Sequence, residues 1–403
     1  MKVVAVAEFY PSRRDPVLGI WAHRQALAVR DAGVEVRVLV LHRLVPPRSS
    51  LAAGPAGVAS SLRRLFREPR SQLRDGLPVT YVPYLSPPRQ RSYASWGTWA
   101  APTVGLALRR LKRVFPFDLV HAHNAVPAGD AVRHMLGDHG SVGLRLSAPL
   151  VVSVHGGDVF YTARRDTAGA AAVARGLGAA RLVLANSQGV AELARANGAR
   201  ETTVVHLGAA VAPAQPAPAK LAGPTLVTVA HLIARKRHAD VLRALAVLEA
   251  RHPKLRYVIV GEGPERPSLE ALAARLGISE RVEFTGQLPP EQAIECLRSC
   301  TVFVMPSTDE AFGVAYIEAM SGGVPAIGCR GEPGPEEIAA AGDGLVLVPP
   351  GDIERLTQRI DELLSDPHRL REAGQRARAT VAAHFTWERC GKQTLAAYEH
   401  ALR

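Results

Sequence analysis

"TVFVMPSTDEAFGVAYIEAMSGGVPAIGC", residues 301–329, changes its pattern twice, and these changes decide the class of fold. Residues 301–307 are mostly apolar and rich in valine, which is typical of a buried strand. Residues 313–323 have the length and spacing of a helix, and residues 324–329 are again apolar. A strand, a helix and a second strand in this order predict a parallel sheet with helices on its faces.

The same alternation continues along all 403 residues. In the first half, apolar runs of strand length occur at 2–7, 34–40, 118–123, 150–155, 181–187 and 202–208. In the second half they occur at 224–230, 256–263, 281–286, 301–307, 324–329 and 344–350. The sequence therefore predicts an α/β fold with two doubly wound, Rossmann-like domains, whose ligands bind at the carboxyl ends of the strands.

A proline- and alanine-rich run separates the two sets of strands. This run is "VAPAQPAPAKLAGP", residues 211–224, and its composition predicts a semi-rigid linker. We therefore expect the first domain to cover residues 1–210 and the second to begin at residue 225.

The positive charge of the chain is confined to its first half. Through residue 213 the chain has 27 Lys and Arg against 13 Asp and Glu, and after it 22 against 24, so the first half holds the whole excess behind the net charge of +12. This asymmetry predicts an acidic partner, such as anionic lipid, nucleic acid or a phosphorylated substrate. A composition that is simply rich in arginine is the alternative.

One basic segment of the first half, "SSLRRLFREPRSQLRDG" (60–76), also has apolar residues at helical spacing. Its basic residues are Arg63, Arg64, Arg67, Arg70 and Arg74, and its apolar residues are Leu62, Leu65 and Phe66. The pattern predicts a short amphipathic helix that lies on an anionic membrane surface. The alternative is a solvated helix, which Pro69 breaks midway.

The cysteines and the first residues indicate the cytoplasm. Cys296, Cys300, Cys329 and Cys390 lack the spacing of a metal site, and a reducing compartment fits them. The apolar run in residues 1–11 is too short for a signal peptide and predicts a first strand. No stretch approaches 18 uninterrupted apolar residues. We expect a cytoplasmic protein, which would lie at the inner face of the membrane if its basic half binds lipid.

Two carboxylates stand around the strand-to-helix transition of the opening stretch. Gly313 falls at the helix start, where unpaired N–H groups and the helix dipole bind phosphate. Glu318, four residues after Val314, projects from the same helix face and can accept two hydrogen bonds from a ribose diol. Glu310 precedes the helix and can reach sugar hydroxyls. The spacing suits a sugar–diphosphate–ribose ligand, although two surface glutamates would give the same pattern.

Two common nucleotide-site motifs are missing. The glycine fingerprint G-x-G-x-x-G does not follow the first strand, and "GEGPER" (261–266) has only its first two glycines, which weakens an NAD or FAD interpretation. No Asp-x-Asp occurs, so an aspartate pair with the spacing of a metal–diphosphate clamp is absent. We expect no cofactor and no essential metal.

The stretch 306–329 closely resembles the nucleotide-sugar site of glycosyltransferase family 4, which are retaining enzymes of the GT-B fold. Further segments resemble the same family: "FYPSRRDPVLGIWAHRQALAV", "VHAHNAVPAG", "SVHGGDV", "LANSQGV", "VGEGPERPSLEALAARLGISERVEFTGQLPPEQ", "GLVLVPPGD" and "FTWERCGKQTLAAYEHAL". The first-domain motifs are similar to those of members that build cell-envelope polysaccharides. The resemblance implies two domains facing a cleft, the second covering 225–385, and a closing helix, 386–403, that returns to the first domain.

The resemblance assigns donor-binding roles in the second domain. Glu310 would hold the donor sugar and Glu318 the ribose. Phe312, Gly313 and Val314 would supply backbone N–H groups to the sugar and diphosphate, and the set is completed by Lys236, His231 and Arg235.

Lys236 matches the phosphate-binding lysine of the family, a point charge suited to a diphosphate. The family usually has an arginine five residues earlier, where this chain has His231. Either His231 donates one hydrogen bond, or Arg235 partly replaces the missing charge; Arg235 is otherwise a solvated side chain.

In the first domain, His155 matches the active-site histidine of the family, with a buried structural histidine as the alternative. Gly19 matches a glycine-rich loop that faces the donor phosphates and the acceptor. Asp158 would orient His155 or touch the acceptor. His121 and His123 have metal-like spacing but no obvious third ligand, so we expect His123 to be an acceptor-side residue without metal.

We therefore expect a retaining glycosyltransferase that uses His155, Glu310 and Lys236 and takes a UDP- or GDP-linked sugar. The acceptor would be a sugar or a lipid-linked glycan, and we expect no nucleic acid partner. The leaving phosphate oxygen would serve as the base. The alternatives are a sugar-nucleotide epimerase of the same shape, a transferase for a small soluble metabolite, a dehydrogenase and a binder of anionic polymers.

Overall fold

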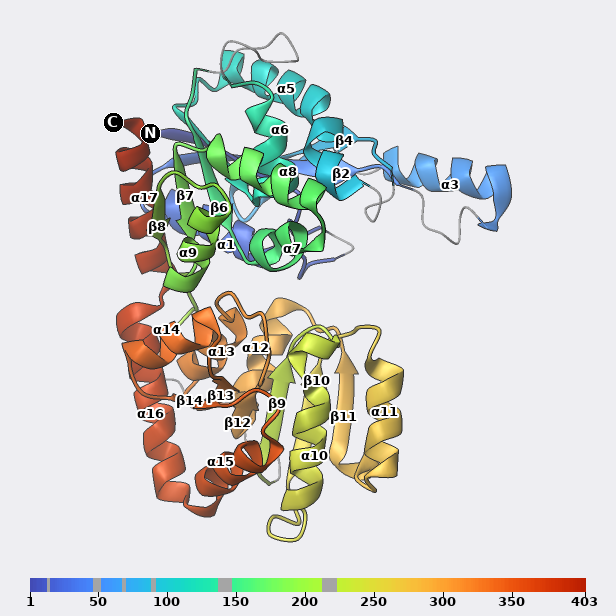
Figure 1. Ribbon diagram of the computed structural model, residues 1–403, viewed down its shortest axis with the longest axis vertical. Helices are drawn as coiled ribbons and strands as arrows, with labels where there is room; N and C mark the ends of the chain where they lie inside the picture. Colours follow the sequence, from blue (N-terminus) through green and yellow to red (C-terminus); the bar gives the residue numbers. More distant parts are fainter. Residues whose placement is uncertain (13–14, 46–51, 67–69, 88–91, 137–146, 212–222) are drawn as a thin grey trace. The chain divides into compact units, whose positions relative to one another are not determined.

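The structure is a computed structural model that describes residues 1–12, 15–45, 52–66, 70–87, 92–136, 147–211 and 223–403 (Figure 1). The chain divides into two units. Unit 1 contains Met1–Val205 and Cys390–Arg403, and unit 2 contains His206–Arg389. Most of the expected linker, 211–224, lies outside the described residues.

Unit 1 is built on an eight-stranded sheet with the order β3-β4-β2-β1-β5-β6-β7-β8. Its strands are β1 Lys2–Ala7, β2 Glu35–Arg43, β3 Ser71–Arg74, β4 Leu77–Tyr84, β5 Leu119–His123, β6 Leu150–Val154, β7 Leu182–Ala185 and β8 Thr202–Val204. Its helices are α1 Ile20–Asp31, α3 Gly54–Phe66, α5 Trp96–Val114, α6 Asp130–Arg133, α7 Ala163–Arg165, α8 Thr167–Gly178, α9 Gln188–Ala196 and α17 Trp387–Leu402. All neighbouring strands are parallel except β3 and β4. The parallel sheet confirms the predicted class of fold.

The hairpin of β3 and β4 corrects the expectation of a helix over residues 60–76. The helix α3 ends at Phe66, and Ser71–Arg74 pairs with β4 as an antiparallel strand. Asp75 and Gly76 form the turn with positive φ angles of 47° and 80°, the conformation that an Asp-Gly pair favours in a two-residue hairpin. Arg67 and Pro69 lie outside the described residues.

The helix α17 packs on the other elements of unit 1. The Gln25 side chain donates a hydrogen bond to Thr394 Oγ1 at 3.1 Å, and the Tyr398 hydroxyl lies 2.7 Å from His121 Nδ1. A Cβ at Gly391 would lie 2.2 Å from the Ala28 carbonyl oxygen, so only glycine permits this approach.

The boundaries of the units differ slightly from the expected ones. Residues 206–210 and 386–389 belong to unit 2, because the two segments run together there. The Ala209 N–H donates to the Phe385 carbonyl at 2.9 Å, and Ala209 and Thr386 form a parallel bridge.

Unit 2 is built on a six-stranded, fully parallel sheet with the order β11-β10-β9-β12-β13-β14. Its strands are β9 Thr225–Val229, β10 Arg256–Val260, β11 Val282–Gly286, β12 Val302–Val304, β13 Ala326–Cys329 and β14 Leu345–Val348. Its helices are α10 His238–Leu248, α11 Arg266–Arg275, α12 Pro290–Ser299, α13 Val314–Ser321, α14 Pro333–Ala341, α15 Ile353–Ser365 and α16 Pro367–His384.

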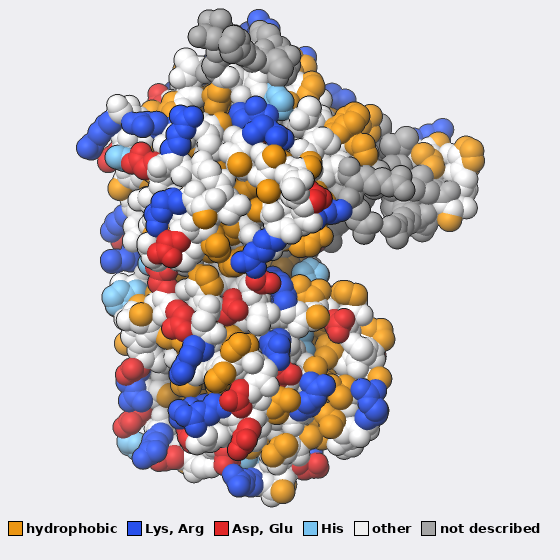
Figure 2. Space-filling view, in the orientation of Figure 1, with side chains coloured by type: hydrophobic (Ala, Val, Ile, Leu, Met, Phe, Trp, Pro, Cys, Tyr) orange, Lys and Arg blue, Asp and Glu red, His pale blue; other side chains and the backbone are white. Residues whose placement is uncertain are grey.

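Surface charge differs between the two units. On the face shown in Figure 2, side chains of both signs are interspersed over unit 2, whereas Lys and Arg predominate over the described part of unit 1. Within the described ranges, no helix is both long enough and apolar enough to cross a membrane.

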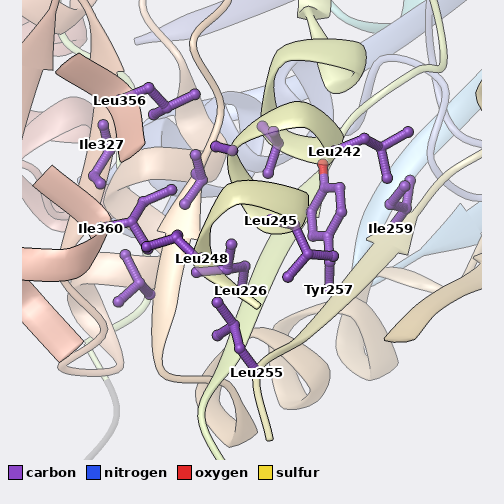
Figure 3. Close-up of a cluster of buried hydrophobic side chains, with 14 of the residues drawn as sticks. Leu226, Leu242, Leu245, Leu248, Leu255, Tyr257, Ile259, Ile327, Leu356 and Ile360 are labelled. Atoms are coloured by element: carbon purple, nitrogen blue, oxygen red, sulfur yellow. The ribbon is translucent and has the colours of Figure 1, made fainter. Parts of the chain in front are cut away.

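A large hydrophobic cluster of unit 2 lies between its sheet and the helices α10, α11 and α15 (Figure 3). Leu242, Leu245 and Leu248 of α10 recur at helical spacing and pack beside Tyr257 of β10. Leu356 of α15 belongs to the same cluster. This packing holds β9 rigidly, and the loop after β9 is therefore anchored at its start.

Each sheet reverses its strand order at one point. In unit 1, β1 lies between β2 and β5, and in unit 2, β9 lies between β10 and β12. The exit loops on either side of such a point diverge and leave a crevice at the carboxyl ends of the strands, where open α/β sheets bind their ligands. We therefore expect functional residues in the exit loops of β1 and β5 and in the exit loops of β9 and β12.

Candidate active site

The exit loops of β9 and β12 bring two predicted site residues together. Lys236 ends a short 3₁₀ helix, Ala234–Lys236, that follows β9. Glu310 lies in the loop between β12 and α13. The Thr308 N–H donates to the Arg235 carbonyl at 2.9 Å, which ties the two loops to one another.

Lys236 and Glu310 form a buried ion pair. The Lys236 ammonium lies 2.5 Å from Glu310 Oε2, and the Ser307 hydroxyl donates to the same oxygen at 2.9 Å. Arg235 Nη1 lies 3.8 Å from it. The side chains of Lys236 and Glu310 are each only 11% exposed. Two opposite charges at this depth are stable because each compensates for the other.

Burial and charge act in opposite directions on this pair. Burial alone would raise the pKa of Glu310, but the Lys236 ammonium and the Arg235 guanidinium outweigh it, so the pKa is lowered. Burial lowers the pKa of Lys236, and the Glu310 carboxylate opposes this shift. Glu310 is therefore held as a carboxylate beside a cation.

The helix α13 begins at Val314, directly after Gly313, so Gly313 lies at the helix start as predicted. Gly313 is the N-cap, with a φ of 87°, and a Cβ at this position would lie 2.3 Å from the Tyr316 ring. Only glycine fits both constraints. Because glycine has no side chain to cap the helix, the first turn presents N–H groups and the positive end of the helix dipole beside Glu310.

Phe312, Val314 and Glu318 flank this helix start. The Phe312 side chain is buried and stacks on His206, with ring centroids 5.8 Å apart, so only its backbone can face a ligand. Val314 and Glu318 are both half-buried and lie one turn apart on α13. The predicted donor-site residues of this loop and helix therefore lie within one continuous segment.

His231 and Arg235 occupy different positions around the pair. His231 Nδ1 lies 2.7 Å from the Glu262 carbonyl, which can only accept, so Nδ1 carries the hydrogen and the neutral ring keeps Nε2 as an acceptor. A neutral His231 can therefore not donate to a phosphate through Nε2. Arg235 donates to the Asp309 carbonyl at 3.2 Å, which turns its charge toward the β12 exit loop. Of the two, Arg235 is better placed to supply positive charge.

In unit 1, the ends of β5 and β6 bring histidines together. His123 Nδ1 lies 3.0 Å from His155 Nε2, and their rings stack with centroids 5.3 Å apart. His121 lies against His123 and bonds the Ser153 hydroxyl at 2.7 Å. Burial lowers the pKa of His123 to about 3 and holds the pKa values of His121 and His155 well below the ordinary range. All three rings are therefore neutral.

Asp158 holds the turn after β5 and does not contact His155 through its described hydrogen bonds. Its carboxylate accepts from Asn124 Nδ2 at 3.2 Å, from the Ala125 N–H at 3.0 Å and from the Val126 N–H at 3.2 Å. Burial raises the pKa of Asp158 to about 6, although these donors oppose the shift. Of the two roles expected for Asp158, the geometry gives no support to orienting His155.

Gly19 caps α1 with a φ of 68°. A Cβ there would lie 2.1 Å from the Phe9 carbonyl carbon, so glycine is required where the β1 exit loop and the start of α1 meet. Trp21 follows on α1 and lies beside His155, with ring centroids 5.9 Å apart. The β1 exit and the β5 and β6 ends therefore lie at the same edge of the sheet.

Several residues of these sites were missed by sequence reasoning. Ser307 and Tyr316 lock the β12 exit loop, since the Tyr316 hydroxyl donates to the Met305 carbonyl and lies 3.3 Å from Ser307 Oγ. Glu332 accepts from the Glu310 N–H at 2.8 Å. Tyr398 reaches His121 from α17. These contacts join distant parts of the chain, and no local pattern indicates them. Among the described residues, no group of three His, Cys, Asp or Glu side chains is arranged to hold a metal ion.

Two family models match the chain. The model of Glycosyltransferase Family 4 matches residues 18–213, and the model of Glycosyl transferases group 1 matches residues 215–380. The two models together match nearly the whole chain, and the predicted resemblance to glycosyltransferase family 4 is confirmed. Both models describe glycosyltransferases, the class of enzyme that the sequence predicted.

Curated relatives carry related names. The chain is 26% identical over 81% of its length, and 80% of the relative's, to TuaC, a Bacillus subtilis protein named for teichuronic acid biosynthesis. It is 32% identical over 41% of its length to an MMP alpha-(1->4)-mannosyltransferase of Mycolicibacterium hassiacum, of which it matches 40%. Several other relatives are likewise matched over less than half of their own length.

Solved structures establish the GT-B fold. Sucrose-phosphate synthase from Thermosynechococcus elongatus matches with a TM-score of 0.76 and 21% identity, over 99% of both chains. HepE of Anabaena, solved with UDP and glucose, matches with a TM-score of 0.72 and 18% identity, over 99% of this chain and 100% of the other. The predicted fold class is confirmed.

Proposed function

We propose that this glycosyltransferase moves a hexosyl group from a nucleotide-diphosphate sugar to an acceptor hydroxyl with retention of configuration. The observation that carries the proposal is the buried pair of Lys236 and Glu310 at the start of α13. A cation and a helix N-terminus suit a diphosphate, and a carboxylate beside them suits sugar hydroxyls. UDP-glucose, UDP-galactose, UDP-N-acetylglucosamine and GDP-mannose all satisfy this chemistry.

Unit 2 supplies the donor contacts in this proposal. Lys236, with Arg235 beside it, stabilises the departing diphosphate, and the N–H groups at Phe312, Gly313 and Val314 bind the sugar and phosphates. Glu310 holds the sugar, and Glu318 accepts hydrogen bonds from the ribose. His231, whose Nδ1 is hydrogen-bonded to the Glu262 carbonyl, lines the donor pocket.

The chemical step needs charge stabilisation rather than a protein nucleophile. The sugar gains oxocarbenium character while its bond to the diphosphate breaks, and the preorganised charges of Lys236 and the helix start offset the developing negative charge. The leaving phosphate oxygen takes the proton of the attacking hydroxyl. Glu310 is paired with a cation and so is not poised as a glycosidase acid.

Unit 1 supplies the proposed acceptor-side contacts. His155 and His123 are neutral and can exchange hydrogen bonds with hydroxyl groups. Gly19 lets the β1 exit loop approach a ligand closely, and Asp158 fixes the turn beside these histidines.

We further propose that the acceptor belongs to cell-envelope polysaccharide or glycolipid synthesis and that the protein acts in the cytoplasm, at the inner face of the membrane. The name of TuaC and the mannosyltransferase names of other relatives support this class of acceptor. The basic first half of the chain supports an anionic surface as a partner.

The described surface that fits a membrane best is the outer face of α5. Trp99 and Leu106 are 48% and 45% exposed, and Pro102 lies between them on the same face. Arg109, Arg110 and Arg113 follow toward the end of the helix, and all three are exposed. An exposed tryptophan beside a cluster of arginines is the pattern of a helix at an anionic lipid interface.

A nucleotide panel tests the proposed reaction. Thermal unfolding is measured with UDP, GDP and the four sugar nucleotides, because a ligand that binds the native state raises the melting temperature. Release of UDP or GDP from the stabilising donor is then measured with and without octyl glycosides. Release that the glycoside stimulates, with a new glycosidic product, supports the transferase. Conversion of the donor sugar into its epimer without a product would support the epimerase instead.

Vesicle sedimentation tests the membrane proposal. The triple variant Arg109→Gln, Arg110→Gln, Arg113→Gln should lose binding to phosphatidylglycerol vesicles at low salt, while donor hydrolysis stays intact. The matched control removes three exposed arginines of unit 2: Arg256, Arg275 and Arg371. Equal loss in both triple variants would show that only net charge matters, and absence of sedimentation at any salt would favour a soluble acceptor.

A further inference from the structure

The loop between β13 and α14, together with the first turn of α14, holds Glu310 by both of its backbone groups. Glu332, the N-cap of α14, accepts a hydrogen bond from the Glu310 N–H through Oε2 at 2.8 Å. The Gly334 N–H donates to the Glu310 carbonyl at 3.3 Å. The backbone of Glu310 is therefore clamped from one side by a segment 22 residues further along the chain.

The same segment also holds the neighbour of Gly313. A Cβ at Gly334 would lie 2.1 Å from Phe312 Cα, so glycine alone allows the loop to lie this close. Glu337 of α14 lies 2.5 Å from His206 Nε2, and His206 stacks on the Phe312 ring. Residues 332–337 thus brace the backbone of 310–312 at several points.

The position of Glu332 is electrostatically costly. Burial raises the pKa of Glu332, and the carboxylates of Asp309 and Glu310 raise it further, while the bond from the Glu310 N–H and the charge of Arg235 oppose this. A third acidic group beside two others lowers stability unless a specific bond offsets the repulsion. The bond to the Glu310 N–H is such an interaction.

We propose that Glu332 is a positioning residue, which fixes the orientation of Glu310 toward the donor sugar. The proposal rests on the donor-sugar role proposed for Glu310. The Lys236–Glu310 pair alone would leave the backbone at residue 310 able to turn, and the carboxylate with it. Glu332 acts through the backbone N–H and requires only an acceptor oxygen at that point, so a glutamine can replace it.

Three single variants separate this role from a general effect of charge. Glu332→Ala removes the acceptor, and Glu332→Gln keeps it without the charge. Glu336→Ala is the matched control, because Glu336 accepts from the Gly331 N–H at 2.8 Å on the same loop but does not contact Glu310. The readouts are the kcat and KM for release of UDP or GDP from UDP-glucose and GDP-mannose, and the Kd of UDP and GDP alone.

Glu332→Ala should lower kcat by about tenfold or more, while the KM of the donor and the affinity for the bare diphosphate change by less than about threefold. Glu332→Gln should recover most of the lost kcat, and Glu336→Ala should match the wild type. In a Glu310→Ala background, Glu332→Ala should cause no further loss, because Glu332 acts only by orienting a carboxylate that Glu310→Ala already lacks. Additive losses in the double variant, or a Glu332→Gln as inactive as Glu332→Ala, would overturn the proposal.

Amide hydrogen exchange gives a readout that does not depend on turnover. Peptides that cover residues 305–313 should exchange faster in Glu332→Ala than in the wild type or in Glu336→Ala. Unchanged exchange would overturn the clamp whatever the activity. A wild-type protein that turns over none of the donors, yet shows the faster exchange in Glu332→Ala, would contradict the proposed function and not the clamp.

Discussion

Units 1 and 2 place polar groups at the same point of their sheets but treat charge in opposite ways. After β9 and β12, Lys236 and Glu310 are buried as an ion pair. After β5 and β6, burial keeps His123 and His155 neutral, and they bond to one another. Both sites lie at the carboxyl ends of central strands, where the two sheets have the same topology.

The two sites differ in the ligand groups that they can bind without burying a new, unpaired charge. A paired cation and a helix start can accept an anionic diphosphate, because the ligand replaces one partner of an existing pair. Neutral imidazoles can donate and accept hydrogen bonds with hydroxyl groups and carry no charge that must be solvated. We therefore infer that unit 2 is specialised for the charged part of the reaction and unit 1 for its neutral part.

Lys236→Ala should have the largest effect on this comparison. Removing the ammonium leaves Glu310 buried without its main partner and removes a charge from the diphosphate, which should cost about 2–4 kcal/mol in transition-state stabilisation. The measurement is kcat/KM for the stabilising donor, with folding checked by thermal unfolding. Arg235→Ala is the control, because Arg235 is more exposed and lies farther from Glu310. A larger loss of kcat/KM in Arg235→Ala than in Lys236→Ala would show that Arg235, and not Lys236, supplies the charge that stabilises the diphosphate.

Glu318→Ala should have the next largest effect. If the carboxylate accepts two hydrogen bonds from the ribose, the variant loses about 1.5–3 kcal/mol of binding, which would raise the donor KM and lower turnover. The affinity for UDP or GDP should fall with the KM, since both carry the ribose. A folded variant whose nucleotide affinity equals that of the wild type would contradict the ribose contact.

The pH dependence of stability should reveal the neutral histidines of unit 1. Because burial holds the pKa of His123 at about 3, below the usual value for histidine, the unfolded chain binds more protons between the two values. Stability is therefore lost as the pH falls below about 6.5, by about 1.4 kcal/mol for this residue between pH 7.5 and 5.5. Thermal unfolding of His123→Gln should show a shallower slope over this window. Equal slopes in the variant and the wild type would show that the pKa of His123 is the same in the folded and the unfolded chain, and would contradict the buried, neutral ring.

His231→Arg should have the smallest effect. The variant restores the residue usual in the family, and Arg235 already supplies charge nearby. We therefore expect kcat/KM to stay equal or to rise by a factor that corresponds to less than about 1 kcal/mol of transition-state stabilisation. A folded but inactive variant would show that the bond between His231 and the Glu262 carbonyl has its own role.

The fold was largely predictable because its strands are buried on both faces. Twelve apolar runs were expected as strands, and each overlaps one of the observed parallel-sheet strands. The strands β3 and β4 were missed, because their residues alternate between more buried and more exposed positions and give no continuous apolar run; the edge strand β3 even carries exposed Leu73. Asp75-Gly76 was the signal that could have found them.

The site was predictable only where it is continuous in sequence. Gly313 and Glu318 share one loop and helix, and local spacing is enough to relate them. Lys236 was found through resemblance, and its contact with Glu310 joins residues 74 positions apart. Glu332 and Tyr398 depend on how loops and α17 pack, which is a property of the tertiary structure and leaves no periodic trace.

The central claim is that the donor diphosphate binds unit 2 at Lys236. Calorimetric titration of UDP and GDP into the wild type, Lys236→Ala and His123→Gln tests it most directly. We expect one of the nucleotides to bind the wild type, to bind Lys236→Ala at least about tenfold more weakly, a loss of about 1.4 kcal/mol, and to bind His123→Gln with wild-type affinity. Equal affinity for all three proteins, or a loss confined to His123→Gln, would contradict the account.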